Sequence, residues 1–393
     1  MLRACRRSPG WSQTSPGSRR RRRRCALPRS RLWLWAGQAA ILLGIAALVA
    51  AIAATTARNL DRLGIQHGFD FLFQPAGFDL GTTLLPFTST SPVYMAFLAG
   101  IANTLVLTVL AIALSTLIAL VVALLCMSGD RLLGAIGWSY VEIFRNIPAL
   151  LQIFVCYFVV LRALPAATDS LDLGGWMAIN NRGIFLPAIG VGGGGALVEA
   201  LGLAAAVAGA AIVLRHRARR WLVLLGVAAA ALWALRWGTV TAPTLGRFGY
   251  ESRWEISPEL CALVLGLAVY NASYIAEIIR SGINAVPRGQ WEAARALGFT
   301  PAQTLRRIVF PQALRVILPP MANAYLNVLK ASSLGAAVAY PEVVSVMVGT
   351  TNNIVGRPIE IMALTLVTYL LISLLVAFIM HRIDRRVGRS AAL

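Results

Sequence analysis

Residues 292–311 read EAARALGFTPAQTLRRIVFP and form a charged, helix-prone segment in a chain built largely from lipid-length apolar runs. Glu292 opens one predicted helical turn, and Gly298 permits a bend. Thr300 followed by Pro301 is typical of an N-cap and the first residue of a second short helix. A structured polar hairpin between two apolar runs favours a docking surface, so this stretch predicts a membrane protein that works with a soluble partner.

The composition also indicates a membrane protein. The chain is 58% hydrophobic and 13% charged, and its mean hydropathy of +0.70 is far above that of soluble domains. The net charge of +20 comes from arginines clustered at the ends of apolar runs, with Lys330 as the single lysine. This placement is typical of membrane proteins and argues against nucleic-acid binding, in which basic and aromatic residues interleave on a polar face.

Eight apolar stretches are long enough to cross a bilayer, which takes about 20 residues. They lie near residues 33–55, 98–126, 138–163, 197–214, 221–238, 259–280, 316–338 and 361–381. Pro148 lies near the start of the third stretch, and Pro319–Pro320 makes the seventh irregular; broken backbone at membrane depth must be buried in protein or line a cavity. We predict an all-α integral membrane protein with about eight transmembrane helices.

The arginines also set the orientation, because cytoplasmic loops are enriched in basic residues. They collect in residues 1–32, at Arg215–Arg220 and in residues 280–315, whereas acids such as Asp172 lie in the alternate loops. Both termini and residues 292–311 are therefore expected to face the cytoplasm. Residues 1–32 are too polar and arginine-rich to fold, and they predict a disordered cytoplasmic tail.

The sequence predicts neither a metal site nor a catalytic site. The five cysteines show no CxxC spacing, and His67, His216 and His381 are scattered. The glycine run at 192–195 precedes an apolar stretch instead of joining a strand to a helix, so it does not indicate a phosphate-binding loop. We expect no cofactor.

Several motifs resemble those of one transporter family. The spacing of Glu292-Ala293-Ala294, Gly298, Ile308 and Pro311 is similar to that of the EAA loop of bacterial ABC importer permeases, with Phe310 where the family usually has Leu. Further matching runs are Phe144–Gln152 (pattern Arg-x-x-Pro-x-x-x-Gln), Asn271–Ile283, Lys330–Leu334 and Tyr340–Glu342. The chain resembles the permeases for polar amino acids, and among them one subunit of the general L-amino acid importers. The match covers roughly residues 98–163 and 259–381.

The resemblance implies a type I importer permease core of five helices within the predicted eight. The expected parts are the tail over 1–32, an extra transmembrane helix over 33–57, a periplasmic segment over 58–97, a permease domain over 98–385, an inserted helical hairpin at about 197–238, and a cytoplasmic EAA-type coupling loop over 282–315. Two added spans in a hairpin leave the sidedness of everything after them unchanged, so the resemblance and the arginine pattern agree.

The resemblance also implies how the coupling loop works. The residues expected to dock an ATP-binding subunit are Glu292, Ala293, Ala294, Gly298, Ile308 and Pro311. In the family, closure of the ATPase dimer moves such a loop and the membrane helices with it, so the partner hydrolyses ATP and this chain is not an enzyme. A hairpin lying on lipid headgroups is the alternative, but the bend at Gly298 and Pro301 favours docking.

Polar residues within predicted spans mark a candidate substrate path. The residues are Asn271, Tyr274, Asn323, Asn327 and Lys330. The last three share one helical face, which suits the zwitterionic head group of an amino acid. The alternative is structural, because polar side chains in spans also bond neighbouring helices. Glu277 with Arg280 is the predicted i, i+3 pair of this kind.

The predicted function is that of a permease subunit of an ATP-driven importer that moves L-amino acids across the bacterial inner membrane. The expected partners are two copies of an ATP-binding subunit, a second homologous permease, and a periplasmic solute-binding protein placed above Asp169–Asp172 and Glu342. A secondary transporter of small polar solutes is the alternative, although the internal repeats it predicts are not visible. A membrane enzyme would need clustered His, Asp or Glu near an interface, and the sequence has no such cluster.

Overall fold

The computed structural model describes residues 29–62, 68–191, 238–246, 249–252 and 254–390. The chain divides into two compact units, Met1–Gln66 and His67–Leu393. The described part of the first unit is one helix, α1 (Arg29–Arg62). Its segment Gly37–Thr56 has a mean hydropathy of 2.3 over 20 residues, which is enough for a membrane span.

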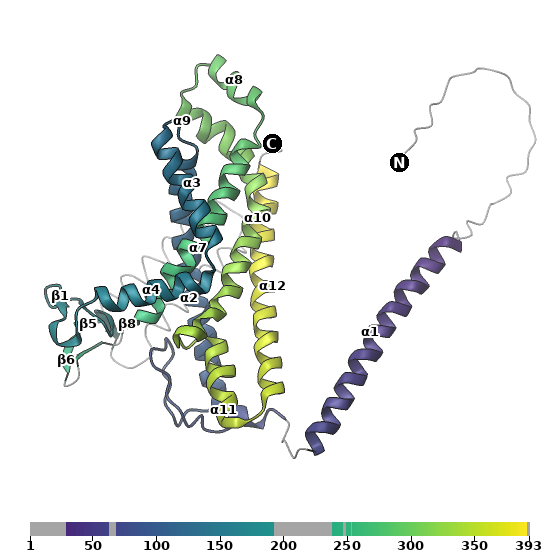
Figure 1. Ribbon diagram of the computed structural model, residues 1–393, viewed down its shortest axis with the longest axis vertical. Helices are drawn as coiled ribbons and strands as arrows, with labels where there is room; N and C mark the ends of the chain where they lie inside the picture. Colours follow the sequence, from purple (N-terminus) through teal and green to yellow (C-terminus); the bar gives the residue numbers. More distant parts are fainter. Residues whose placement is uncertain (1–28, 63–67, 192–237, 247–248, 253, 391–393) are drawn as a thin grey trace, which may run out of the picture. The chain divides into compact units, whose positions relative to one another are not determined.

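The second unit is a bundle of helices whose ends carry short connecting turns. The helices are α2 (Val93–Cys126), α3 (Arg131–Asn146), α4 (Ala149–Ala163), α7 (Pro258–Asn284), α8 (Arg288–Ala296), α9 (Pro301–Thr304), α10 (Phe310–Ala331), α11 (Asn352–Val355) and α12 (Pro358–Ser390). A 3-10 helix (Asp70–Phe73) precedes α2, and a π-helical turn (Leu305–Val309) precedes α10. A 3-10 helix (Ser332–Val338) and a π-helix (Ser345–Thr351) connect α10 to α11. Within this unit, α8 and α9 lie at one end and α11 at the opposite end (Figure 1).

The mostly helical membrane fold is confirmed for the part of the chain that the structure describes. Four helical segments there are long and apolar enough to cross a membrane: Gly37–Thr56, Val93–Cys126, Pro258–Asn284 and Pro358–Val387. The pair α3 and α4 makes a fifth if a span bent by 106° is counted as one. The predicted spans at 197–214 and 221–238 lie outside the described residues, so the number eight stays a prediction.

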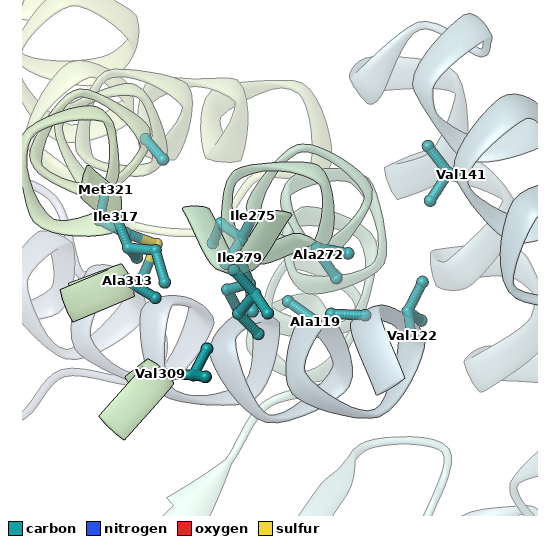
Figure 2. Close-up of a cluster of buried hydrophobic side chains, with 14 of the residues drawn as sticks. Ala119, Val122, Val141, Ala272, Ile275, Ile279, Val309, Ala313, Ile317 and Met321 are labelled. Carbon is teal, nitrogen blue, oxygen red and sulfur yellow. The ribbon is translucent and has the colours of Figure 1, made fainter. Parts of the chain in front are cut away.

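The core of the second unit lies where α2, α7 and α10 meet. Small side chains on α2 and α7, such as Ala119 and Ala272, pack against larger ones such as Ile275 and Ile317 (Figure 2). Small residues let helices approach closely, and membrane helices depend on such packing because lipid gives no hydrophobic drive for helices to associate. This core joins the start of α10 to the middle of α7.

Short strands between α4 and α7 were not expected from the sequence. They are β1 (Leu171–Asp172), β2 (Ala178–Asn180), β3 (Gly183–Leu186), β4 (Ala188–Val191), β5 (Gly238–Thr241), β6 (Thr244–Gly246), β7 (Gly249–Glu251) and β8 (Trp254–Ile256). A small antiparallel sheet has the order β1-β2-β3-β8, and β4–β5 and β6–β7 form separate antiparallel ribbons. The two-residue turn Asn181–Arg182 with Gly183 after it is the sequence signal for the hairpin of β2 and β3.

A segment before α2 is fastened to the start of α12. Arg357 is buried and donates a hydrogen bond of 2.7 Å to the carbonyl of Gly68. The amide of Gly68 donates to the carboxylate of Glu360 at 3.0 Å. Phe71 is 1% exposed and packs with Ile361 in a small apolar cluster. These contacts anchor residues 68–73 against the α12 end of the unit.

Candidate functional site

The predicted bend in residues 292–311 is present. We call residues 288–311 the knob, and Gly298 separates its helices α8 and α9 with a φ of 77°. The amide of Gly298 donates to the carbonyl of Arg295 at 2.9 Å, and that of Phe299 donates to Ala294 at 3.1 Å. This pair of bonds is the Schellman motif, which ends a helix with a left-handed residue. Gly298 is therefore the residue that turns the chain.

The second helix of the knob starts at the predicted cap. The side chain of Thr300 accepts from the amide of Gln303 at 3.3 Å, and the side chain of Gln303 accepts from the amide of Thr300 at 3.0 Å. Pro301 follows as the first helical residue. This reciprocal capping box satisfies two backbone donors at a helix start. The cap at Thr300 is thus confirmed, and it marks the start of α9.

The docking residues predicted from the sequence divide into two groups. Glu292, Ala293 and Gly298 are exposed, so they are free to contact a partner, whereas Ala294 is fully buried. Ile308 and Pro311 are half-buried at the base of the knob. Leu297, which was not among the predicted docking residues, is 75% exposed beside the bend. Leu297 therefore extends the list of exposed residues at the bend beyond those predicted from the sequence.

The surface of the knob is basic. Arg288 and Arg295 on α8 are exposed, as are Arg306 and Arg307 on the following turn, and Glu292 is the acidic residue among them. Behind α8 lies a cavity of about 550 Å³. Its lining includes Met127, Ile283, Val286, Arg288, Trp291 and Glu292. The cavity thus lies between α8, the end of α7 and Met127, the residue that follows α2.

The helix that leads into the knob carries the predicted ion pair. Arg280 contacts the carboxylate of Glu277 at 2.6 Å, which confirms the i, i+3 pair. The guanidinium of Arg280 also lies 4.7 Å from the ring centre of Trp138 on α3. Tyr140 donates to the carbonyl of Val269 at 2.9 Å. These contacts join α3 to α7, the helix that leads into the knob.

Between α3 and α4 the helix breaks at Pro148. Proline has no N–H, so the carbonyl of Phe144 lacks its usual helical donor. The side-chain amide of Gln152 donates to that carbonyl at 2.8 Å and to the carbonyl of Ile147 at 3.0 Å. Tyr274 on α7 donates to the carbonyl of Arg145 at 3.4 Å. The run Arg-x-x-Pro-x-x-x-Gln therefore encodes a sharp break together with the side chain that satisfies it.

The candidate path residues lie in two places. Asn323, Asn327 and Lys330 are exposed along one face of α10, and none of them has a side-chain partner among the described residues. Tyr274 faces the break at Arg145 instead. Asn271 is 4% exposed and donates to the carbonyl of Leu267 on its own helix, as a structural residue does. The structure does not bring the five residues into one cavity.

Glu342 is a correction to the sequence interpretation. It was expected on the surface facing a solute-binding protein, but it is 0% exposed in the connection between α10 and α12. Its carboxyl accepts from the amides of Val344 and Ser345 at 2.8 and 2.7 Å and from Tyr369 at 3.0 Å. Burial raises the pKa of Glu342 to about 7, although these three donors lower it in part. The carboxyl caps the π-helix Ser345–Thr351. No sequence pattern predicted this capping role of Glu342.

Helices long and apolar enough to cross a membrane, with a polar knob at one end of their bundle, define an integral membrane protein. Residues 115–389 match the model of the family described as binding-protein-dependent transport system inner membrane component. The chain belongs to this family. It is thus a transport subunit of the inner membrane and not itself an enzyme.

Named relatives cover nearly the whole chain. The putative amino-acid ABC transporter permease protein YhdX of Escherichia coli K12 is 38% identical over 380 residues, covering 92% of this chain and 95% of that protein. The general L-amino acid transport system permease protein AapQ of Rhizobium johnstonii is 36% identical over 345 residues. This match covers 84% of this chain and 86% of AapQ. The solved structure of an amino acid ABC transporter with histidines covers 75% of this chain and 94% of that chain, with 22% identity and a TM-score of 0.47.

Proposed function

We propose that this chain is a permease subunit of an ATP-driven importer of L-amino acids. Relatives named as amino-acid permeases match it over most of its length, which supports the substrate class. The observation that carries the coupling step is the rigid, exposed knob at one end of the helical unit. Its helices are fixed by the turn at Gly298 and the capping box at Thr300.

The knob is proposed to dock into an ATP-binding subunit. Leu297 and Glu292 present the exposed contact surface, while Ala294, Ile308 and Pro311 support it from within. Because α7 and α10 pack into one core, a force on the knob reaches both helices. The basic surface suits a partner cleft that carries acidic residues. In this proposal the knob and both chain termini face the cytoplasm.

The translocation path is proposed to run along α10. Asn323, Asn327 and Lys330 form a polar, exposed stripe on a helix whose opposite face is buried in the core. A polar stripe inside a membrane must face another protein or water. We propose that a second, homologous permease faces this stripe, with two ATP-binding subunits on the cytoplasmic side and a solute-binding protein on the periplasmic side.

Co-purification and uptake test this function. The chain is produced with its ATP-binding subunit, second permease and solute-binding protein, and uptake of L-glutamine, L-glutamate and L-arginine into proteoliposomes is measured. We expect ATP-dependent uptake by the wild type. Leu297→Asp is expected to lose the ATP-binding subunit on purification. Leu173→Asp is expected to retain it; Leu173 lies between β1 and β2, and this control leucine is 54% exposed against 75% for Leu297. Retention by both variants would contradict docking through the knob.

The second permease is tested separately. The chain and its ATP-binding subunit are purified without any other permease, and substrate-stimulated ATP hydrolysis is measured in the presence of the solute-binding protein. We expect little stimulation, because the polar stripe on α10 then lacks its partner. Full activity of that pair would show that two copies of this chain suffice.

A further inference from the structure

The break between α3 and α4 presents hydrogen-bond donors to whatever lies beside it. The first amides of a helix have no partner within it. In α4, the amides of Leu151 and Gln152 bond to the carbonyl of Pro148, while those of Ala149 and Leu150 make no hydrogen bond among the described residues. The helix runs for 15 residues, so its dipole places partial positive charge at this end.

A positive side chain lies at the same place. Arg145, in the last turn of α3, is exposed and has no ion-pair partner within 4 Å among the described residues. It acts electrostatically on Glu277, but that carboxylate already binds Arg280 at 2.6 Å. Glu142, one turn earlier on α3, accepts from Asn146 instead. The guanidinium of Arg145 is therefore available to an anion.

A buried acceptor completes the arrangement. Gln152 is 6% exposed, and its amide nitrogen reaches across the break to the carbonyls of Phe144 and Ile147. Its oxygen, Oε1, is buried without any hydrogen-bond donor among the described residues. A buried polar atom without a partner costs about 1–3 kcal/mol, so a donor that reaches it gains that energy. The break thus combines anion-binding groups with one unpaired acceptor.

We propose that this break binds the head group of the transported amino acid. This inference rests on the proposed function, because it takes an L-amino acid as the substrate. The carboxylate binds the guanidinium of Arg145 and the free amides at the start of α4, and the ammonium group donates to Oε1 of Gln152. Arginine matches a carboxylate with two parallel hydrogen bonds, and broken helices in transporters direct their amino-terminal ends at anionic substrate groups.

The site also explains how binding would reach the knob. Tyr274 holds the carbonyl of Arg145 and lies on α7, which continues into the knob through Glu277 and Arg280. When the substrate carboxylate binds the side chain of Arg145, it contacts the same residue whose carbonyl accepts the hydrogen bond from Tyr274. The substrate is thereby sensed on the helix that the ATP-binding subunit moves.

Equilibrium binding tests the proposal on the complete purified importer without its solute-binding protein. Binding of radiolabelled L-glutamine is measured, with L-glutamine α-amide, which has no carboxylate, as competitor. We expect the wild type to bind L-glutamine and the α-amide to compete at least tenfold more weakly than unlabelled L-glutamine. Arg145→Gln is expected to weaken L-glutamine binding at least tenfold. Arg131→Gln, an exposed control at the other end of α3, is expected to bind as the wild type does.

Three outcomes separate the alternatives. Equal binding by Arg145→Gln and the wild type, or equal competition by the α-amide, would overturn the proposal. A lipid phosphate is the other anion that Arg145 suits; in that case phosphatidylglycerol stabilises the wild type but not Arg145→Gln, and L-glutamine binding is the same in both, which also overturns it. Absence of uptake of L-glutamine, L-glutamate and L-arginine by the wild-type importer would instead remove the proposed function.

Discussion

Gly282 of α7 lies directly against Ile317 of α10, two residues before α7 ends. A Cβ atom on Gly282 would overlap the side chain of Ile317 and approach its Cδ1 to 3.0 Å. Both residues are buried in the core beneath the knob. Among the described glycines, Gly282 shows the closest approach of a virtual Cβ to a side chain of another helix, and it brings α7 and α10 together beneath the knob.

Replacing Gly282 with alanine is expected to destabilise the second unit by about 1–3 kcal/mol, because an added methyl group overpacks the core. Thermal unfolding of the detergent-purified protein measures the change. Gly289→Ala is the matched control, since a Cβ there meets nothing within 4 Å. The double variant Gly282→Ala, Ile317→Ala should recover part of the loss relative to the sum of the single changes. If the changes in the free energy of unfolding of the two single variants add up to that of the double variant, the two positions are not coupled.

Replacing Gly298 with valine is expected to distort the knob while leaving membrane insertion intact. A β-branched residue at a φ of 77° costs about 1 kcal/mol or more. Uptake and ATP hydrolysis are measured together in proteoliposomes, and hydrolysis should continue with reduced uptake. Gly298→Asn is the control, because asparagine tolerates left-handed backbone. Normal uptake coupled to ATP hydrolysis in Gly298→Val would contradict the proposal that coupling needs the bend at Gly298.

Replacing Gln152 with leucine is expected to weaken the break between α3 and α4. The carbonyls of Phe144 and Ile147 lose their donor, and each unsatisfied buried carbonyl costs about 1–3 kcal/mol. The melting temperature in detergent should fall by several degrees. Gln290→Leu, which loses one exposed side-chain bond to Gln312, should change it little. Equal shifts for the two variants would contradict the role of Gln152 at the break.

The stability of the protein is expected to depend on pH through Glu342. The folded state raises the pKa of this carboxyl from 4.5 to about 7, so it binds a proton more tightly than the unfolded chain does. Its contribution to stability is therefore fully present below pH 4.5 and is lost as the pH rises to about 7. The change is on the order of 3 kcal/mol. Glu342→Gln should flatten this part of the profile, and an unchanged slope would contradict the assignment.

Reporter fusions test the orientation. A reporter fused after Asp172 is expected to be extracytoplasmic, because acids gather in that loop, and one fused after Arg217 is expected to be cytoplasmic. A fusion after Arg386, near the carboxyl terminus, should also report the cytoplasm. Activity of alkaline phosphatase and fluorescence of a cytoplasmic reporter distinguish the two sides. The opposite result at Asp172 or Arg217 would overturn the eight-span arrangement.

The features predicted correctly from the sequence depend on neighbours within one turn of helix. The turn at Gly298, the cap at Thr300 and the pair of Glu277 with Arg280 all involve residues three to five positions apart. Helical spacing alone brings such residues together. The membrane class followed from composition, which averages over the whole chain and is insensitive to local detail.

The features that were missed depend on contacts between distant parts of the chain. Glu342 is an acidic residue in a loop by sequence, and only its packing against Tyr369 on α12 buries it. Pro148 marked an irregular helix, but the 106° bend also needs α4 to pack against Gly266 of α7, where a Cβ would lie 2.8 Å from the Cα of Ile153. The strands between α4 and α7 are too short for their periodicity to stand out.

The pairing of β4 with β5 has a consequence for how this chain can change length. Val191 lies opposite Gly238, so the chain departs into residues 192–237 and returns at a single point. A two-residue turn such as Asn-Gly is the length that connects such a directly opposed antiparallel pair. The two flanking residues are therefore the points at which this chain can be shortened or lengthened without a change in the register of β4 with β5.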